Sequence, residues 1–206
     1  MRPKEVIRFP SGKLHLEGIL TRSQKTARVA VISHPHPLYG GDMDNYVVSL
    51  LGQAFGRLGW STLIFNFRGV GRSEGVFDQG RGEQQDVLSA LAFLKNLGMQ
   101  DIVLAGYSFG AWVNAQAAGM EPDLIASLLV SPPLAMLDFS FVKDDSKTKL
   151  IICGDRDEFC PSADLNKLIQ EWPNPPHLEI IHGADHFFSS GAEELIRAIT
   201  EAESTL

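Results

Sequence analysis

The residues best suited to chemistry lie in the segment Gly106–Gly110, which reads GYSFG. It follows the apolar run DIVLA and precedes the helical spacing of AWVNAQAAG, so it matches G-x-S-x-G in the strand–turn–helix context that this motif requires. Glycines on both sides leave room for a sharp turn, and the turn holds the hydroxyl at a helix N-terminus, where N–H groups favour negative charge. We therefore predict Ser108 as a nucleophile, against the alternative of a chance glycine-rich turn.

A serine hydroxyl needs a base, and the base needs a third group to orient it. With this motif the acid precedes the histidine along the chain. The segment CGDRDEFCP follows one apolar run and offers Asp155 and Asp157, and HGADHFF follows the next run and offers His186. Both segments are expected at the carboxyl ends of parallel strands, where ligand crevices form. We predict His186 as the base and one of the two aspartates as its partner, the other being a turn or capping residue.

The segment HPHPLYGG, residues 34–41, has two interpretations. Two histidines in a turn suggest metal ligands, but a metal site needs further protein ligands, and neither H-E-x-x-H nor a carboxylate cluster is present. Alternatively, the segment supplies a backbone donor to an oxyanion hole, which needs two N–H groups. One would be that of Phe109. The prolines lack an N–H, so the other would come from His36 or Leu38. We expect neither a metal nor a cofactor.

The elements that must position these residues follow from the hydrophobic pattern. Residues 4–10 and 13–22 alternate apolar and polar around Ser11–Gly12, as in an antiparallel pair. Six short runs are apolar on both faces, as in a covered parallel sheet: Arg28–Ser33, Thr62–Phe67, Asp101–Ala105, Ile125–Val130, Lys149–Cys153 and Leu178–Ile181. Segments with helical spacing alternate with these runs. This order predicts a three-layer α/β sandwich, a mainly parallel eight-stranded sheet with helices on both faces.

The chain of 206 residues contains no internal repeat or linker, which favours one domain over residues 1–206. Between the runs ending at Val130 and starting at Lys149 lies SPPLAMLDFSFVKDDSKT, which is too short for a multi-helix insertion. We therefore expect no cap domain over the site.

Composition excludes several classes of function. The formal net charge is −7 and no stripe of Lys or Arg is present, so we expect no nucleic-acid partner. The longest apolar runs are too short to span a bilayer, and the first residues lack an apolar block of signal-peptide type, so we expect no membrane partner and a cytoplasmic protein. Two cysteines, Cys153 and Cys160, form neither a disulfide framework nor a common zinc spacing.

Other residues near the expected site are open to more than one interpretation. The segment NFRGVGRSEG contains G-x-G but lacks the third glycine of a dinucleotide fingerprint. Its Arg68 either braces the loop or meets an acidic substrate group. We predict Leu38, Phe139 and Phe187 as substrate contacts in an acyl pocket, and packing of the phenylalanines against the core is the alternative.

These motifs together resemble those of the α/β-hydrolase superfamily over nearly the whole chain. The likeness is greatest to small bacterial hydrolases without a lid that carry HPHP, GG and NFRGVGRSEG, and more distant to dienelactone hydrolases, which use cysteine where this chain has Ser108. GDRDEFCP looks like the family's G-x-x-D-x-x-[VC]-P, which implies Asp157 as the acid. GADHFF looks like G-x-G-H-F, with Asp185 in place of glycine, and implies His186. The family's H-G-x pattern implies His36 as the second oxyanion donor.

The expected function is hydrolysis of a small ester or thioester by a Ser-His-Asp triad through an acyl-enzyme, as in carboxylesterases. An amidase or peptidase with the same triad is one alternative. A binding module without catalytic activity on this fold is another.

Overall fold

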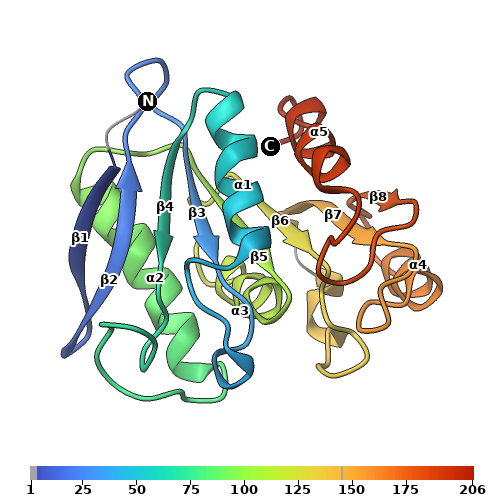
Figure 1. The fold of residues 1–206 in the computed structure, drawn as a ribbon, viewed down its shortest axis with the longest axis horizontal. Helices are drawn as coiled ribbons and strands as arrows, with labels where there is room; N and C mark the ends of the chain where they lie inside the picture. The colour runs from blue at the N-terminus through green and yellow to red at the C-terminus, as the bar shows by residue number, and fades with distance from the viewer. Residues whose placement is uncertain (1–3, 145) are drawn as a thin grey trace.

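The computed structural model describes residues 4–144 and 146–206, and its eight strands form one sheet (Figure 1). Their order across the sheet is β1-β2-β4-β3-β5-β6-β7-β8. The strands are β1 (Lys4–Ser11), β2 (Leu14–Thr21), β3 (Val29–Ser33), β4 (Ser61–Phe65), β5 (Ile102–Tyr107), β6 (Ala126–Val130), β7 (Thr148–Gly154) and β8 (His177–Ile181). Every predicted strand is present, so the expected fold class is confirmed.

The sheet begins with an antiparallel part and continues as a parallel one. Strand β1 pairs with β2, which then pairs antiparallel with β4. From β4 to β8 every neighbouring pair is parallel. The carboxyl ends of β3, β5, β6, β7 and β8 therefore meet at one edge of the sheet, the arrangement that creates a ligand crevice in open α/β sheets.

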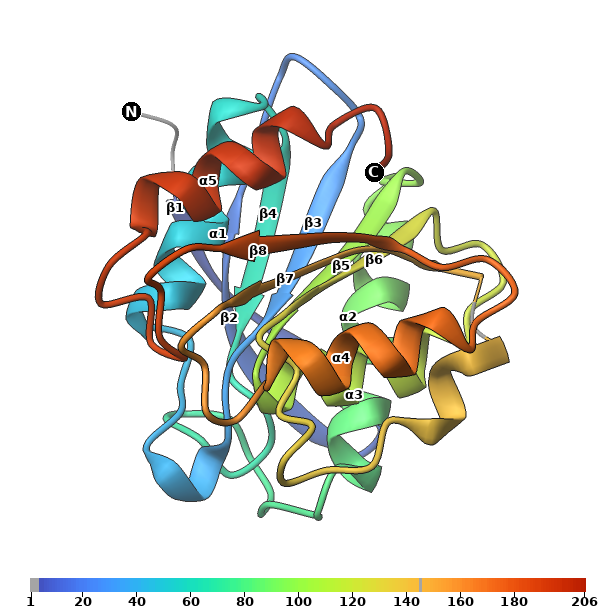
Figure 2. The same ribbon diagram turned by 90° about the vertical axis from the view of Figure 1, so that its right-hand side faces the viewer.

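In the described part of the chain, five α-helices cover the two faces of the sheet. They are α1 (Tyr46–Arg57), α2 (Arg81–Asn96), α3 (Phe109–Ala118), α4 (Ser162–Gln170) and α5 (Ala192–Glu201). Figure 2 shows the layers, with α1 and α5 on one side of the sheet and α2, α3 and α4 on the other. This is the predicted three-layer sandwich.

Each face has its own apolar core. On the α1 and α5 side, Leu51, Phe55 and Ile196 pack with sheet residues such as Ile32 and Val130. On the other side, two clusters pack α2, α3 and α4 against the sheet. Burying alternate side chains of the same strands on opposite faces explains why these runs are apolar throughout.

One run departs from the expected pattern. Strand β8 lies at the edge of the sheet, and Ile180 is 38% exposed. An edge strand has a neighbour on one side only, so its side chains are covered less completely than those of the central strands.

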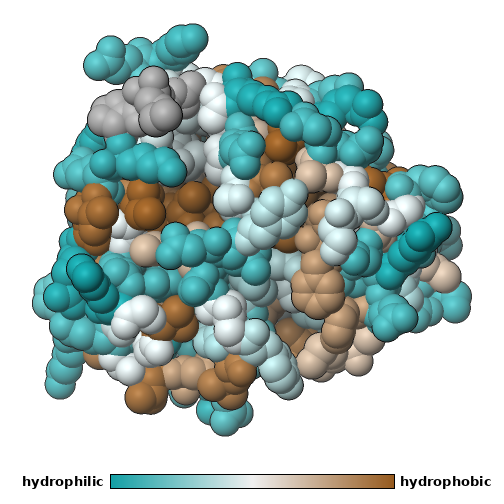
Figure 3. All heavy atoms as spheres, viewed as in Figure 1, coloured by the Kyte–Doolittle hydropathy of each residue, from teal (hydrophilic) through white to brown (hydrophobic). Residues whose placement is uncertain are grey.

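The segment between β6 and β7 forms no cap over the sheet. Its described residues contain one short 3-10 helix, Ser140–Asp144, and residue 145 lies outside the described part of the chain. Within residues 4–144 and 146–206 no helix is long and apolar enough to cross a membrane. On the face shown in Figure 3, hydrophilic residues predominate, and hydrophobic residues interrupt them in separate areas.

Candidate active site

Ser108 occupies a sharp turn between β5 and α3. Its backbone angles are φ 54° and ψ −120°, a left-handed conformation that is costly for a residue with a side chain. Its N–H donates to the carbonyl of Val130, and its own carbonyl accepts from the N–H of Ala111. These bonds hold the strained turn, which carries the hydroxyl out of the sheet edge.

The two glycines of the motif allow a close approach that other residues would block. A Cβ on Gly110 would lie 2.5 Å from the carbonyl oxygen of Ser33, at the end of β3. A Cβ on Gly106 would lie 2.4 Å from the carbonyl oxygen of Gly110. The glycines therefore bring the start of α3 directly against the segment that begins with His34.

A continuous chain of hydrogen bonds links the three residues predicted as a triad. The imidazole Nε2 of His186 lies 3.0 Å from Ser108 Oγ, and its Nδ1 lies 2.9 Å from both carboxylate oxygens of Asp157. The carboxylate accepts a hydrogen bond from the Nδ1–H of neutral His186. The Nε2 atom therefore carries no proton and can accept the proton of the serine hydroxyl. All three side chains are buried, with residue exposures of 8%, 7% and 4% for Ser108, His186 and Asp157.

Asp157 is held in its charged form. Burial acts to raise its pKa, but the hydrogen bond and charge of His186 and the N–H of Cys160 outweigh it, so the pKa lies below its ordinary value. The N–H groups of Phe159 and Cys160 both donate to Oδ1 at 2.9 Å. The carboxylate is thus fixed in place and charged at neutral pH.

Asp155, the other aspartate considered from sequence, has a different environment. Its carboxylate accepts hydrogen bonds from the Gly183 N–H, at 2.7 Å, and from His182 Nδ1. These bonds lower its pKa and connect the loop after β7 to the loop after β8. Asp155 therefore supports the loop that leads to His186. None of the hydrogen bonds described for Asp155 joins it to the His186 imidazole.

His186 is positioned by both its backbone and its ring. The hydroxyl of Tyr107 donates to the His186 carbonyl at 2.9 Å. The ring of Phe159 packs on the imidazole at a centroid distance of 4.7 Å, and Phe187 meets it edge-on at 5.5 Å. The carboxylate of Asp185 accepts from the N–H groups of Phe187 and Ser189, so the residue that replaces a glycine of the family pattern caps this turn.

The two histidines of the HPHP segment have distinct environments. His34 is fully buried: its Nδ1 donates to the Pro35 carbonyl at 2.7 Å, and its Nε2 accepts from the Phe67 N–H at 3.0 Å. Burial lowers the pKa of His34 to about 4. The His36 ring packs between Tyr39, Phe77 and Phe109, with centroid distances of 4.7–4.9 Å.

The surroundings of these two histidines do not resemble a metal site. Both ring nitrogens of His34 have protein partners. Among the residues that the structure describes, no group of three or more His, Cys, Asp or Glu side chains is arranged to hold a metal ion.

Two backbone N–H groups near Ser108 remain available for a substrate oxygen. In the described hydrogen bonds, neither the Phe109 N–H nor the His36 N–H has an acceptor, and both residues line the cavity at Ser108. The Leu38 N–H instead donates to His36 Nδ1 at 3.2 Å. Of the two donors left open by the sequence, His36 is therefore the one with a free N–H at the cavity.

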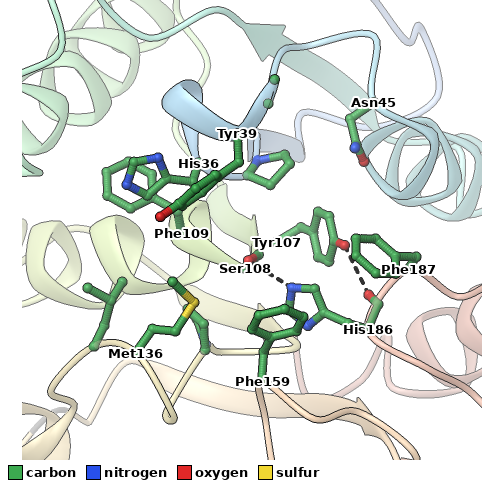
Figure 4. A pocket seen from close by; sticks show the side chains of 15 residues that line it. His36, Tyr39, Asn45, Tyr107, Ser108, Phe109, Met136, Phe159, His186 and Phe187 are labelled. Carbon is green, nitrogen blue, oxygen red and sulfur yellow. Dashed lines mark hydrogen bonds between the residues drawn. The ribbon is translucent and has the colours of Figure 1, made fainter.

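A cavity of about 570 Å³ opens above Ser108 and His186 (Figure 4). Its walls are mostly apolar, and their residues come from the carboxyl end of β5 and from the segments that follow β3, β5, β6, β7 and β8. The lining residues are Pro35, His36, Tyr39, Gly40, Gly41, Asn45, Tyr107, Ser108, Phe109, Pro133, Met136, Leu137, Phe159, His186 and Phe187. No Asp, Glu, Lys or Arg is among these described residues.

The structure separates the three residues predicted as substrate contacts. Phe187 lines the cavity and is 59% exposed. Phe139 is instead 4% exposed and packs in the core beside α4, so the residues between β6 and β7 that line the cavity are Pro133, Met136 and Leu137. Leu38 lines a separate, shallower depression next to the cavity.

Arg68 braces its loop. Its guanidinium makes two hydrogen bonds to the carboxylate of Asp86, at 2.8 and 3.0 Å, and the carboxylate also accepts from the Arg68 N–H. Ser11 donates to the same carboxylate. With its guanidinium committed to Asp86 and outside the cavity lining, Arg68 takes the first of the two roles considered for it.

The chain is similar to known proteins over nearly its whole length. A model described as the alpha/beta hydrolase family matches residues 33–147. Protein RP471 of Rickettsia prowazekii is 36% identical over 210 residues, which cover 97% of this chain and 87% of that protein. An alpha-beta serine hydrolase homologue from Coxiella burnetii is 33% identical, with a TM-score of 0.91 over 97% of both chains. XC6422 from Xanthomonas campestris, described as an a/b serine hydrolase without lid, is 28% identical, with a TM-score of 0.89 over 96% of this chain and 92% of that one.

Proposed function

Because this chain belongs to the alpha/beta hydrolase family, we propose that it is a serine hydrolase that cleaves small, uncharged esters or thioesters through an acyl-enzyme. The observation that carries the proposal is the hydrogen-bond chain from Asp157 through His186 to Ser108. A free serine hydroxyl is a weak nucleophile, and the hydrogen bonds to His186 and Asp157 activate it.

In the first half of the reaction, Ser108 Oγ attacks the carbonyl carbon of the ester while its proton passes to His186 Nε2. Asp157 stabilises the resulting imidazolium. The substrate oxygen, now negative, accepts hydrogen bonds from the N–H groups of Phe109 and His36. Collapse of the intermediate breaks the bond to the leaving group, which takes the proton from His186, and leaves Ser108 acylated.

In the second half, water takes the place of the leaving group. His186 accepts a proton from the water as the oxygen attacks the acyl carbon, and the same two N–H groups stabilise the new oxyanion. The bond to Ser108 then breaks, and the serine recovers its proton from His186. The acid product departs and the site returns to its initial state.

The cavity favours uncharged substrates. Its lining contains aromatic, methionine and proline side chains and no lysine, arginine or acidic residue, and Arg68 is paired with Asp86. A charged group entering this cavity would lose hydration without meeting a lysine, arginine or carboxylate of opposite charge. A volume of about 570 Å³ falls within the range of sites for small molecules.

A fluorophosphonate probe tests the nucleophile, because an activated serine attacks phosphorus as it attacks a carbonyl carbon. We expect the probe to label Ser108, and we expect a folded Ser108→Ala protein to remain unlabelled. Labelling that persists in the variant would assign the reactive group elsewhere. A panel of esters, thioesters and amides with matched acyl groups then measures which bond is cleaved fastest.

A further inference from the structure

Asn45, which directly precedes helix α1, is the one residue in the described cavity lining that has a side-chain amide. It is the N-cap of that helix, and its Oδ1 accepts from the Val47 N–H at 2.9 Å and from the Val48 N–H at 3.4 Å. Because both partners are donors, the amide oxygen must face the helix. The amide nitrogen therefore points away from the helix, and no acceptor for Nδ2 occurs among the described hydrogen bonds.

The position of Asn45 in the cavity is on the side of His186. Helix α1, which begins directly after Asn45, packs against α5, the helix that follows the His186 loop. Figure 4 likewise shows Asn45 on the side of Ser108 where His186 and Phe187 lie, with Met136 and Phe109 on the other side.

This side of the cavity is where a leaving group must lie. In the proposed reaction His186 Nε2 delivers its proton to the leaving oxygen, so that oxygen must come within hydrogen-bond distance of the imidazole. The rest of the alcohol then extends past His186, between Phe187 and Asn45. Phe187 offers apolar contact there, and Asn45 offers a fixed hydrogen-bond donor.

On the basis of the proposed function, we infer that Asn45 is a specificity-determining residue that recognises an oxygen acceptor in the alcohol part of the ester. The class of substrate is an ester of an oxygen-bearing alcohol, such as a polyol or an ether alcohol. Few polar groups line this cavity, and in such sites a small number of placed donors determines orientation and specificity. The helix cap fixes the amide before the substrate binds, so little conformational entropy is lost on binding.

Two isosteric esters isolate this interaction. Butyl acetate and 2-methoxyethyl acetate share the acyl group and nearly the same shape, and they differ by an ether oxygen in place of a methylene. The measured quantity is the ratio of kcat/KM for the methoxyethyl ester to that for the butyl ester. When this ratio is compared between the unmodified protein and a variant, any difference in the intrinsic chemical reactivity of the two esters cancels.

Two substitutions remove the amide donor and keep the cap: an ionised aspartate has no donor, and the shorter serine side chain does not carry its hydroxyl to the position of the amide nitrogen. In Asn45→Asp and Asn45→Ser a side-chain oxygen still accepts from the first turn of α1, so we expect both proteins to fold, as thermal unfolding would verify. The loss of one hydrogen bond to the substrate should lower the ratio about threefold to tenfold in both. The matched control is Ser49→Ala, an exposed residue of the same helix outside the cavity lining, which should leave the ratio unchanged.

Two outcomes would overturn the inference. One is an unchanged ratio in both variants; if activity toward both esters also falls equally, the cap has a purely structural role. The other is failure of the unmodified protein to hydrolyse either ester. If that protein also failed to react with fluorophosphonate, the proposed function itself would be contradicted.

Discussion

Asp155 and Asp157 both follow β7, yet they make different contacts. Asp157 accepts from His186 Nδ1 with both oxygens, whereas Asp155 accepts from Gly183 and His182 in the neighbouring loop. We expect Asp157→Asn to lower kcat on the order of 10⁴-fold, because an amide no longer fixes the tautomer or stabilises the imidazolium. The measurement is the steady-state hydrolysis of a chromogenic ester.

Asp155→Asn serves as the matched control two residues earlier in the same loop. It keeps an oxygen that can accept from Gly183, and we expect it to cost less than about tenfold in kcat, since it removes loop support worth about 1 kcal/mol. The reverse ranking of the two variants would assign the orienting role to Asp155 and contradict the proposed triad.

The lowered pKa of His34 predicts that the free energy of unfolding depends on pH. Burial lowers its pKa from 6.5 to about 4, so between these values the unfolded chain binds a proton that the folded chain does not. The free energy of unfolding should therefore decrease as the pH falls from 6.5 to 4, by about 3 kcal/mol from this residue, and level off below that.

Chemical denaturation across this pH range measures the effect. The comparison is His34→Gln, in which an amide oxygen can still accept from the Phe67 N–H and no proton is taken up. The variant should lose stability at pH 7 but show a shallower pH dependence between 4 and 6.5. Equal slopes for both proteins would show that other groups cause the pH dependence.

At the scale of elements, the contact between α3 and the end of β3 brings the predicted nucleophile to the predicted oxyanion donors. Gly110 permits this contact, since its Cβ would lie 2.5 Å from the Ser33 carbonyl oxygen. We expect Gly110→Ala to lower the free energy of unfolding by about 1–3 kcal/mol through overpacking. It should also lower kcat, because the Phe109 N–H would move relative to the HPHP loop.

Gly119 provides the matched control at the other end of the same helix. Its φ is −67°, and a Cβ there would come no closer than 3.8 Å to a neighbouring atom. Gly119→Ala should therefore leave kcat unchanged and stabilise the fold slightly, by less than about 1 kcal/mol. Thermal unfolding and ester hydrolysis of both variants test the pair, and equal behaviour of the two would contradict the packing argument.

The local hydrophobic pattern of the sequence predicts the strands well. It does not predict the order of the strands across the sheet or the residues that form the walls of the cavity. Apolar runs and alternation mark all eight strands because these patterns report which faces are buried. That β4 lies between β2 and β3 depends on pairing, about which periodicity carries no information. Met136 lines the cavity from a loop without a motif, and Phe159 lines it from a variable position of GDRDEFCP. Phe139, an aromatic suited to a pocket, packs in the core instead.

At the scale of the whole molecule, the loops that form the site all lie at one edge of the sheet. Ser108, Asp157 and His186 follow β5, β7 and β8, and the HPHP loop follows β3, so residues separated by more than 150 positions meet there. The motifs were predictable one at a time because each directly follows a strand. Their proximity follows from the parallel arrangement, since every strand from β3 onward delivers its next loop to the same edge.

The same arrangement leaves the site open to solvent. In the described residues the segment between β6 and β7 contributes a wall through Pro133, Met136 and Leu137 and contains only one short 3-10 helix. Without a lid in the described residues there is no closure step to limit turnover, and the apolar surface for an acyl chain is confined to the walls of the cavity of about 570 Å³. We therefore expect acetate and butyrate esters to be hydrolysed faster than long-chain esters, with rates that rise smoothly through the solubility limit of the substrate. Initial rates across that limit, for esters of two to sixteen acyl carbons, provide the measurement. A sharp increase in rate at the limit, or a strong preference for sixteen carbons, would require an element that covers the cavity and that the described residues do not supply.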